Sequence, residues 1–188
     1  MARVAWFFPT PSDDDIPEGL RSLFAKAQQA VGFLPNVFRG YAYRPERFSS
    51  WFRHFSALQE PTPNLDTADR EMIGVVVSAI NRCPYCVISH GHALRAALGD
   101  QFTADAIAVN WRHADLDDRR RAICAYAEKL TRAPHTVGED DLRALAAVGL
   151  STEEVWDVVE LVAMYAFTNR LALATGQMPN EQYHYVDR

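Results

Sequence analysis

Proline and glycine residues divide this chain into segments of helical length, and no convincing run between them alternates apolar and polar residues as a strand does. The pattern predicts an all-α fold. About nine helices are expected, over residues 17–32, 36–43, 45–58, 66–82, 84–98, 103–111, 117–133, 139–147 and 151–176.

Local residues account for several of the expected helix starts. Pro45 and Pro84 suit the first position of a helix, where a missing N–H costs no hydrogen bond. Ser151 offers a hydroxyl cap, and Glu154 three residues later completes a capping box. These starts therefore follow from side-chain chemistry as well as from helix propensity.

The length and the apolar content point to one domain. A chain of 188 residues with 48% hydrophobic residues can bury a core without support from metal or disulfides. The proline-containing segment 61–65 separates an aromatic-rich section, residues 1–60, from residues 61–188. We expect the first section to pack on the second within a single domain.

Charge and hydropathy argue against two classes of partner. The formal net charge is -5 with both signs mixed along the chain, so nucleic acid is not an expected partner. Prolines interrupt the apolar stretch near the N-terminus, which leaves no signal-peptide core. The apolar run 155–174 would be costly in lipid because it contains Asp157, Glu160, Asn169 and Arg170. We therefore expect a buried helix there, no membrane partner and a cytoplasmic location.

Two of the three cysteines, Cys83 and Cys86, form a CxxC motif, and Cys124 stands apart. If a helix begins near Cys83, then Cys86 and His90 follow on the same helix face. Amide hydrogens and the dipole at a helix N-terminus favour a thiolate. The spacing predicts an activated thiol pair, in which helix position makes Cys83 the more acidic thiol.

Such a pair is suited to redox catalysis. A thiolate that attacks a hydroperoxide becomes a sulfenic acid, and a second thiol nearby then closes a disulfide before further oxidation. His90 can take the thiol proton or supply a proton to the leaving alkoxide. Glu71, on the preceding helix, can orient the imidazole if the two helices pack as a hairpin. The expected catalytic residues are Cys83, Cys86, His90 and Glu71.

A metal site is the competing interpretation of this motif. Structural zinc requires four ligands, whereas Cys83, Cys86 and His90 supply three. His92 points to a different side of the helix, about 200° from His90. We therefore expect no metal and no other bound cofactor.

The remaining candidate residues are expected to have simpler roles. Tyr85, between the cysteines, is expected to pack or to form a hydrogen bond, with a supporting catalytic role as the alternative. Cys124 lies in an apolar helical stretch and is expected to be a small buried side chain. His54 and His92 are expected at the surface or in packing contacts.

The spacing around the cysteines resembles that of a known family. Glu71 is followed, after eleven residues, by Cys83-x-x-Cys86-x-x-x-His90. This pattern resembles the AhpD-like alkylhydroperoxidase and carboxymuconolactone decarboxylase superfamily, in its uncharacterised peroxidase-related branch. The resemblance covers nearly the whole chain, and further segments similar to that branch are 34–38, 126–131 and 169–170.

The resemblance implies an AhpD-like helical bundle that assembles into a homo-oligomer, as a dimer, trimer or hexamer. It also implies a cysteine-based peroxidase or disulfide reductase that reduces hydrogen peroxide or organic hydroperoxides. By position, Cys86 attacks the peroxide, Cys83 resolves the product, and Glu71 and His90 relay protons. AhpD proper has a histidine where this chain has Tyr85, so the full relay is not expected to carry over unchanged.

The resemblance further implies a lipoylated or other dithiol electron donor, and a peroxiredoxin as a protein partner. Two alternatives stay open. One is a decarboxylase-like lyase acting on a ring lactone, whose relatives do not depend on a cysteine pair. The other is a non-enzymatic, redox-sensing oligomer with aromatic side chains at its interface, although packing within their own chain is the preferred interpretation. Those aromatic residues are Trp6, Phe7, Phe8, Trp51, Phe52 and Phe55.

Overall fold

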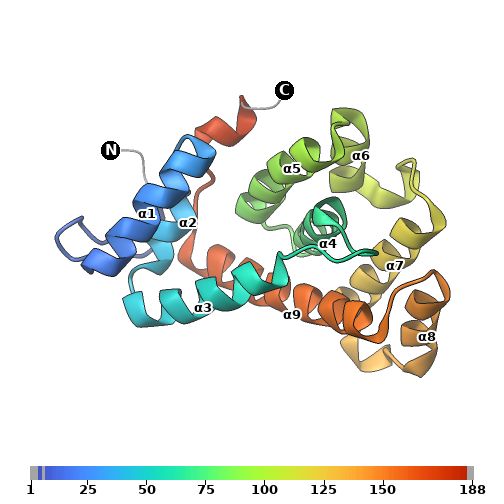
Figure 1. Ribbon diagram of the computed structural model, residues 1–188. Coiled ribbons are helices and arrows are strands. Elements are labelled where there is room, and N and C mark those ends of the chain that lie inside the picture. The colour runs from blue at the N-terminus through green and yellow to red at the C-terminus, as the bar shows by residue number, and fades with distance from the viewer. Residues whose placement is uncertain (1–3, 6, 186–188) are drawn as a thin grey trace.

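A computed structural model describes residues 4–5 and 7–185 and confirms the all-α fold (Figure 1). The described residues form nine α-helices: α1 (Glu18–Val31), α2 (Asn36–Tyr41), α3 (Pro45–Leu58), α4 (Thr67–Ile80), α5 (Pro84–Leu98), α6 (Gln101–Asn110), α7 (Asp118–Arg132), α8 (Glu139–Ala147) and α9 (Thr152–Thr175). Three short 3-10 helices complete the list: η1 (Trp111–His113), η2 (Pro134–Thr136) and η3 (Glu181–His184).

Most helix ends lie within two residues of their predicted positions, and caps explain the agreement. Pro45 and Pro84 are the first residues of α3 and α5. The Ser151 hydroxyl accepts the Glu154 N–H at 3.2 Å, and the Glu154 carboxylate accepts the Ser151 N–H at 2.8 Å. The expected capping box is therefore present. The short helix η3, in contrast, was not predicted.

Helix α6 begins two residues earlier than predicted, at Gln101. The Asp100 carboxylate accepts the Thr103 N–H at 3.2 Å and so caps the helix at that earlier point. Helix α4 ends at Ile80, short of the predicted residue 82. There the backbone of Arg82 takes a left-handed conformation, with φ of 54°, and α5 begins two residues later.

Helix α4 lies at the centre of the molecule, packed against α5, α7 and α9 (Figure 1). Its buried residues include Met72, Val75 and Val76, which belong to the largest apolar cluster of the described residues. Because only three residues separate α4 from α5, the two helices pack side by side along their length. This hairpin is the arrangement that the expected Glu71–His90 contact requires.

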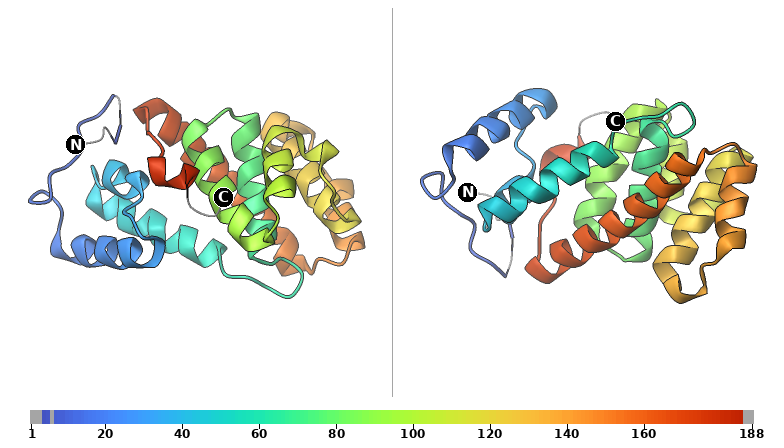
Figure 2. Two further views of the ribbon diagram at one scale, coloured as in Figure 1. Left: turned by 90° about the horizontal axis from the view of Figure 1, so that it is seen from above. Right: turned by 60° about the horizontal axis from the view of Figure 1, so that its bottom comes forward.

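A second apolar cluster joins α1, α2 and α3, with Phe24, Phe38 and Phe48 at its centre. The three rings pack on one another with centroids 5.5–5.8 Å apart. In both views of Figure 2 these helices lie at one end of the molecule, and α7 and α8 lie at the opposite end. The Tyr41 hydroxyl donates to the Thr168 carbonyl of α9 at 3.1 Å, which links the two parts.

The aromatic side chains near the N-terminus have different environments. Trp51, Phe52 and Phe55 on α3 are partly buried. Trp51 and Phe52 pack against the cluster of α1, α2 and α3, and Phe55 packs against the largest cluster, so the prediction of packing within the chain is confirmed for them. Phe7 and Phe8 are instead 70% and 47% exposed, so the prediction of ordinary packing is wrong for them. Their neighbour Trp6 lies outside the described residues.

By length and composition, α9 is the one helix of the described residues that is apolar enough to cross a membrane. Core helices meet the same criterion, so this is weak evidence for a membrane span. The helix packs against α4 and α7, and its buried side chains include Glu154 and Asn169. These contacts are those of a core helix.

Candidate functional site

The CxxC motif occupies the N-terminus of α5. Cys83 is the N-cap residue, and its backbone N–H donates to the Ser78 carbonyl at 3.0 Å. Cys86 follows one turn later, and the two sulfur atoms are 3.2 Å apart as free thiols within hydrogen-bond distance. Both side chains are buried, with 1% and 4% of their surface exposed. The pair is therefore reduced and close enough to close a disulfide after a small movement.

The two thiols differ in acidity. The hydrogen bond shared with Cys86 lowers the pKa of Cys83 to about 7, although burial opposes this effect. The backbone amides of Cys86 and Tyr85, at the start of the helix, lower it further. The same shared hydrogen bond and burial raise the pKa of Cys86. In the singly ionised pair one sulfur is negative, and the remaining proton lies between the two.

His90 and Glu71 meet across the α4–α5 hairpin. His90 Nδ1 and Glu71 Oε2 are 2.7 Å apart. The histidine lies one helical turn after Cys86, and both residues line one cavity. The structure therefore brings together the four expected catalytic residues, with Glu71 placed to orient the imidazole as the sequence suggested.

The aromatic ring of Tyr165, on α9, holds the other side of His90. The two rings pack edge to face with centroids 4.8 Å apart. A close approach of α4 and α9 makes this possible, because a Cβ at Gly74 would lie 2.6 Å from the Tyr165 ring. Sequence reasoning missed Tyr165, since nothing in an apolar helix marks one tyrosine as a neighbour of the site.

Two buried polar residues beside Cys86 were also missed. Ser78 and Asn169 have no exposed surface, and Asn169 Nδ2 donates to the Ser78 hydroxyl at 2.9 Å. Asn169 Oδ1 in turn accepts from Asn81 Nδ2 at 2.9 Å. Hydrogen bonds from Asn169 and Ser78 act to lower the pKa of Cys86, against the larger opposing effects. The signal in the sequence was Asn169 itself, a polar residue within an apolar helix.

A cavity of about 350 Å³, which we call the aromatic pocket, opens beside Cys86 and His90. Most of its wall is apolar, and the polar groups of Glu71, Cys86 and His90 converge on it. Helices α2 and α3 supply much of the wall. The aromatic side chains that line it are Phe38, Tyr41, Trp51, Phe52, Phe55, Tyr85 and Tyr183.

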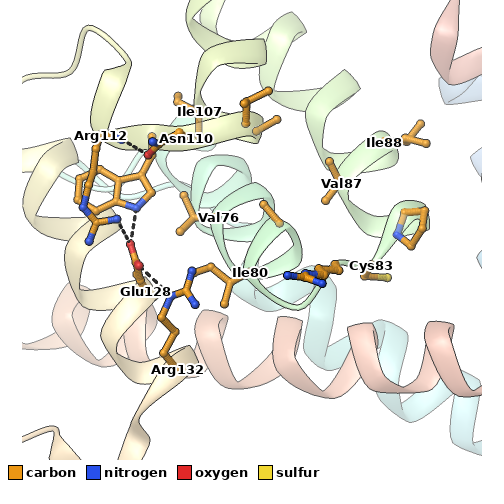
Figure 3. A pocket seen from close by; sticks show the side chains of 16 residues that line it. Val76, Ile80, Cys83, Val87, Ile88, Ile107, Asn110, Arg112, Glu128 and Arg132 are labelled. Atoms are coloured by element: carbon orange, nitrogen blue, oxygen red, sulfur yellow. Dashed lines mark hydrogen bonds and ion pairs between the residues drawn. The ribbon is translucent and has the colours of Figure 1, made fainter.

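A second cavity of about 680 Å³, which we call the arginine pocket, is lined by Cys83 and by residues of α4, α6 and α7 (Figure 3). Its rim carries Arg82, Arg112 and Arg132. Glu128 lies among them and accepts from Arg112, from Arg132 Nε at 2.8 Å and from Trp111 Nε1 at 2.8 Å. No sequence feature pointed to this cavity.

The remaining candidate residues, Tyr85, Cys124, His54 and His92, have packing or surface positions. The Tyr85 hydroxyl accepts the Val37 N–H at 3.1 Å and so ties α5 to α2. Burial raises the pKa of Cys124 to about 12, which makes it an inert thiol in the core of α7. His54 is exposed, and the His92 ring packs beside Tyr183 at 5.5 Å. Among the described residues no three His, Cys, Asp or Glu side chains are grouped to hold a metal ion.

A family model, a curated protein and solved structures all match this chain. Residues 45–129 match the model of the carboxymuconolactone decarboxylase family. The alkyl hydroperoxide reductase AhpD of Mycobacterium marinum is 31% identical over 88 residues, which span 46% of this chain and 39% of that protein. The chain thus matches well under half the length of that curated relative.

Two solved structures match over the whole chain. The alkylhydroperoxidase AhpD core protein of Ralstonia eutropha JMP134, described as an uncharacterized peroxidase-related protein, is 35% identical with a TM-score of 0.95. The match covers 100% of this chain and 98% of that one. An uncharacterized peroxidase-related protein of Silicibacter sp. TM1040 is 34% identical with a TM-score of 0.92, over 100% of this chain and 97% of that one.

Proposed function

Because this chain belongs to the AhpD-like carboxymuconolactone decarboxylase superfamily, we propose that it is a cysteine peroxidase that reduces hydrogen peroxide or organic hydroperoxides. The observation that carries the proposal is the reduced, buried pair of Cys83 and Cys86, 3.2 Å apart beside the hydrogen-bonded His90 and Glu71. The aromatic pocket gives the peroxide a place to bind against Cys86.

The first half of the cycle consumes the peroxide. The pair gives one proton readily to His90, because Cys83 has a pKa of about 7. When Cys83 holds the remaining proton, Cys86 is the thiolate and attacks the terminal peroxide oxygen. The O–O bond breaks, and the alkoxide takes a proton from His90 to leave as an alcohol. Glu71 holds the imidazole in place during this transfer.

The second half closes the disulfide. Cys86 now carries a sulfenic acid, and the sulfur of Cys83 attacks it from within the same turn of helix. The proton of Cys83 leaves with the hydroxyl group as water. The balance is one peroxide and two thiols consumed, with one alcohol, one water and one disulfide formed. A reductant that supplies two thiol groups, on one molecule or on two, must then restore both cysteines.

Partners and location follow from the same proposal. A dithiol, lipoylated or of another kind, is a candidate reductant, and a peroxiredoxin is a candidate protein partner. Three free thiols fit a reducing compartment such as the cytoplasm. We also propose that the chain works as a homo-oligomer.

The direct test replaces Cys86 by serine and follows peroxide consumption under single-turnover conditions. We expect the Cys86→Ser variant to lose all measurable turnover, because serine cannot form a sulfenic acid. Cys124→Ser serves as the control and keeps full activity, since Cys124 is buried in the core of α7 away from the pair. Unchanged turnover in Cys86→Ser would contradict the assigned roles.

Replacement of the cysteine pair also distinguishes the two alternatives from the peroxidase. Lactone turnover that survives replacement of both Cys83 and Cys86 would favour the lyase, whose chemistry needs no thiol. A disulfide that forms with peroxide yet never turns over with any dithiol, and that changes the oligomer mass, would favour the redox sensor.

A further inference from the structure

Helix α5 presents its two cysteines to two different cavities. Its residues Cys83, Pro84, Val87 and Ile88 line the arginine pocket. The residues that line the aromatic pocket are Tyr85, Cys86, Ser89, His90, His92 and Ala93. At about 100° per residue, Pro84, Val87 and Ile88 face away from the second set, and Cys83, the N-cap residue, lies at the boundary between the two sides. The thiol pair therefore lies between the cavities, with one sulfur belonging to each.

The two cavities differ in polarity. The aromatic pocket is walled mainly by apolar rings, and a bound carboxylate would lose its hydration there without a cationic partner among the arginines. The arginine pocket carries three guanidinium groups against the single carboxylate of Glu128. That carboxylate is already engaged by Trp111, Arg112 and Arg132. The arginine pocket is thus a positive site on a chain whose net charge is -5.

Arg82 is the guanidinium nearest in sequence to Cys83, and its own charge is uncompensated. The side chain is exposed, and it has no ion-pair partner among the residues that the structure describes. Figure 3 shows Arg112, Glu128 and Arg132 at the far side of the cavity from Cys83. A ligand with its reactive end at Cys83 therefore has Arg112 and Arg132 across the cavity, and Arg82, the neighbour of Cys83 in the chain, lines the same cavity.

We infer that the arginine pocket is the entry for an anionic, carboxylate-bearing small thiol that reduces the Cys83–Cys86 disulfide by attacking Cys83. The peroxide enters through the aromatic pocket on the opposite side of α5. This inference rests on the proposed function, because it assigns a route to the reductant that the proposed cycle requires.

The exchange follows the ordinary chemistry of thiols and disulfides. The incoming thiolate attacks Cys83 Sγ, the S–S electron pair passes to Cys86 Sγ, and a mixed disulfide forms on Cys83. Ser78 and Asn169 stabilise the Cys86 thiolate as it leaves. A second molecule of the thiol then attacks the outer sulfur and releases Cys83 as a thiolate. Two small thiols become one small disulfide, and both cysteines return to their reduced state.

The opposed faces of α5 suit this reaction. Attack on a disulfide proceeds along the S–S axis, from the side away from the leaving sulfur. Cys83 lines the arginine pocket and Cys86 lines the aromatic pocket, so a nucleophile in the arginine pocket meets Cys83 and leaves Cys86 as the departing sulfur. The low pKa of Cys83, about 7, also makes it a good leaving group in the release step.

The test measures reduction of the disulfide separately from its formation. The disulfide is installed with diamide, so no peroxide activity is needed. Rates of reduction are then measured with mercaptoacetate, 2-mercaptoethanol and cysteamine, which carry negative, zero and positive charge at similar size. Ratios between thiols are compared across variants, so that their intrinsic reactivities cancel.

We expect Arg82→Glu to lower the ratio of the mercaptoacetate rate to the 2-mercaptoethanol rate about tenfold, and Arg132→Glu to lower it in the same direction. The ratio of the cysteamine rate to the 2-mercaptoethanol rate should rise in both variants. Arg47→Glu, an equal charge change at an exposed site on α3, leaves both ratios unchanged. Rapid quenching with N-ethylmaleimide should find the mercaptoacetate adduct on Cys83 and the alkyl group on Cys86.

Several outcomes would overturn the inference. Ratios that stay constant in Arg82→Glu and Arg132→Glu would show that the pocket does not select the thiol. An adduct on Cys86 would show that reduction proceeds through the aromatic pocket. Slow reduction by all three thiols that speeds up on dilution would show that another copy of the chain covers the pocket. None of these results bears on the proposed function, which fails instead if peroxide does not form the disulfide.

Discussion

At the scale of single residues, the proton shared by the two thiols governs reactivity. The pKa of Cys83 falls to about 7 chiefly because of its hydrogen bond with Cys86, and the pKa of Cys86 rises for the same reason. Helix position alone already favoured Cys83 as the more acidic thiol, whereas the family resemblance assigns the attack to Cys86. Both statements hold together if Cys83 accepts the proton of Cys86 before the attack.

The pH dependence of alkylation tests this shared proton. In the reduced protein, alkylation of the pair by iodoacetamide should rise with pH with a midpoint near 7, because the thiolate is the nucleophile. The reaction is slow below that midpoint, where the pair is fully protonated. In Cys86→Ala the midpoint moves upward toward the ordinary thiol range, since the stabilising hydrogen bond is gone.

Peptide mapping identifies the alkylated residue and supplies the control. Cys124, whose pKa burial raises to about 12, should stay unmodified at every pH in this series. A midpoint for Cys83 that is the same in the wild-type protein and in Cys86→Ala would refute the role of the shared proton.

At the scale of elements, the turn between α4 and α5 sets the site. Only three residues join the helices, and Arg82 makes the reversal with φ of 54°, a conformation that glycine adopts more easily. The turn places Cys83 at the helix N-terminus while α4 carries Glu71 toward His90. A strained backbone at Arg82 fits the proposal that its side chain contributes to the arginine pocket.

The strain at Arg82 can be measured by comparing two substitutions. We expect Arg82→Gly to be more stable to urea than Arg82→Ala by about 1 kcal/mol, because only alanine keeps the strained backbone. Both variants lose the charge equally, so the charge cancels in the comparison. Gly99→Ala, at φ of 63° with open space around it, should show a loss of similar size. Equal stability of the two Arg82 variants would show that the turn carries no strain.

At the scale of the whole molecule, local signals predicted more than long-range ones. The nine helices followed from caps, prolines and glycines such as Pro84 and Ser151, whose effects act within one helical turn. The contact between Glu71 and His90 needed the hairpin, which sequence spacing only permitted. Ser78, Tyr165 and the arginine pocket depend on how α9, α4 and α7 pack, and no short motif encodes that packing.

The oligomer proposed here should involve α9. Trp156 and Phe167 are 65% and 53% exposed, and they lie eleven residues apart on one face of that helix. Large exposed apolar side chains aligned in this way mark contact surfaces. We expect Phe167→Glu to lower the mass measured by sedimentation. Leu142→Glu, a change to the same residue at the 36% exposed Leu142 of α8, should leave the mass unchanged, and equal effects of both substitutions would contradict the assignment.

The burial of both sulfur atoms has a consequence for the chain's place in a cell. With 1% and 4% of their surface exposed, Cys83 and Cys86 meet only those molecules that the two cavities admit. The oxidation state of the pair is then set by the rates of those two encounters, and it need not equilibrate with the thiols of the surrounding solution. The fraction of the chain that carries the disulfide would then depend on the concentrations of one oxidant and one reductant.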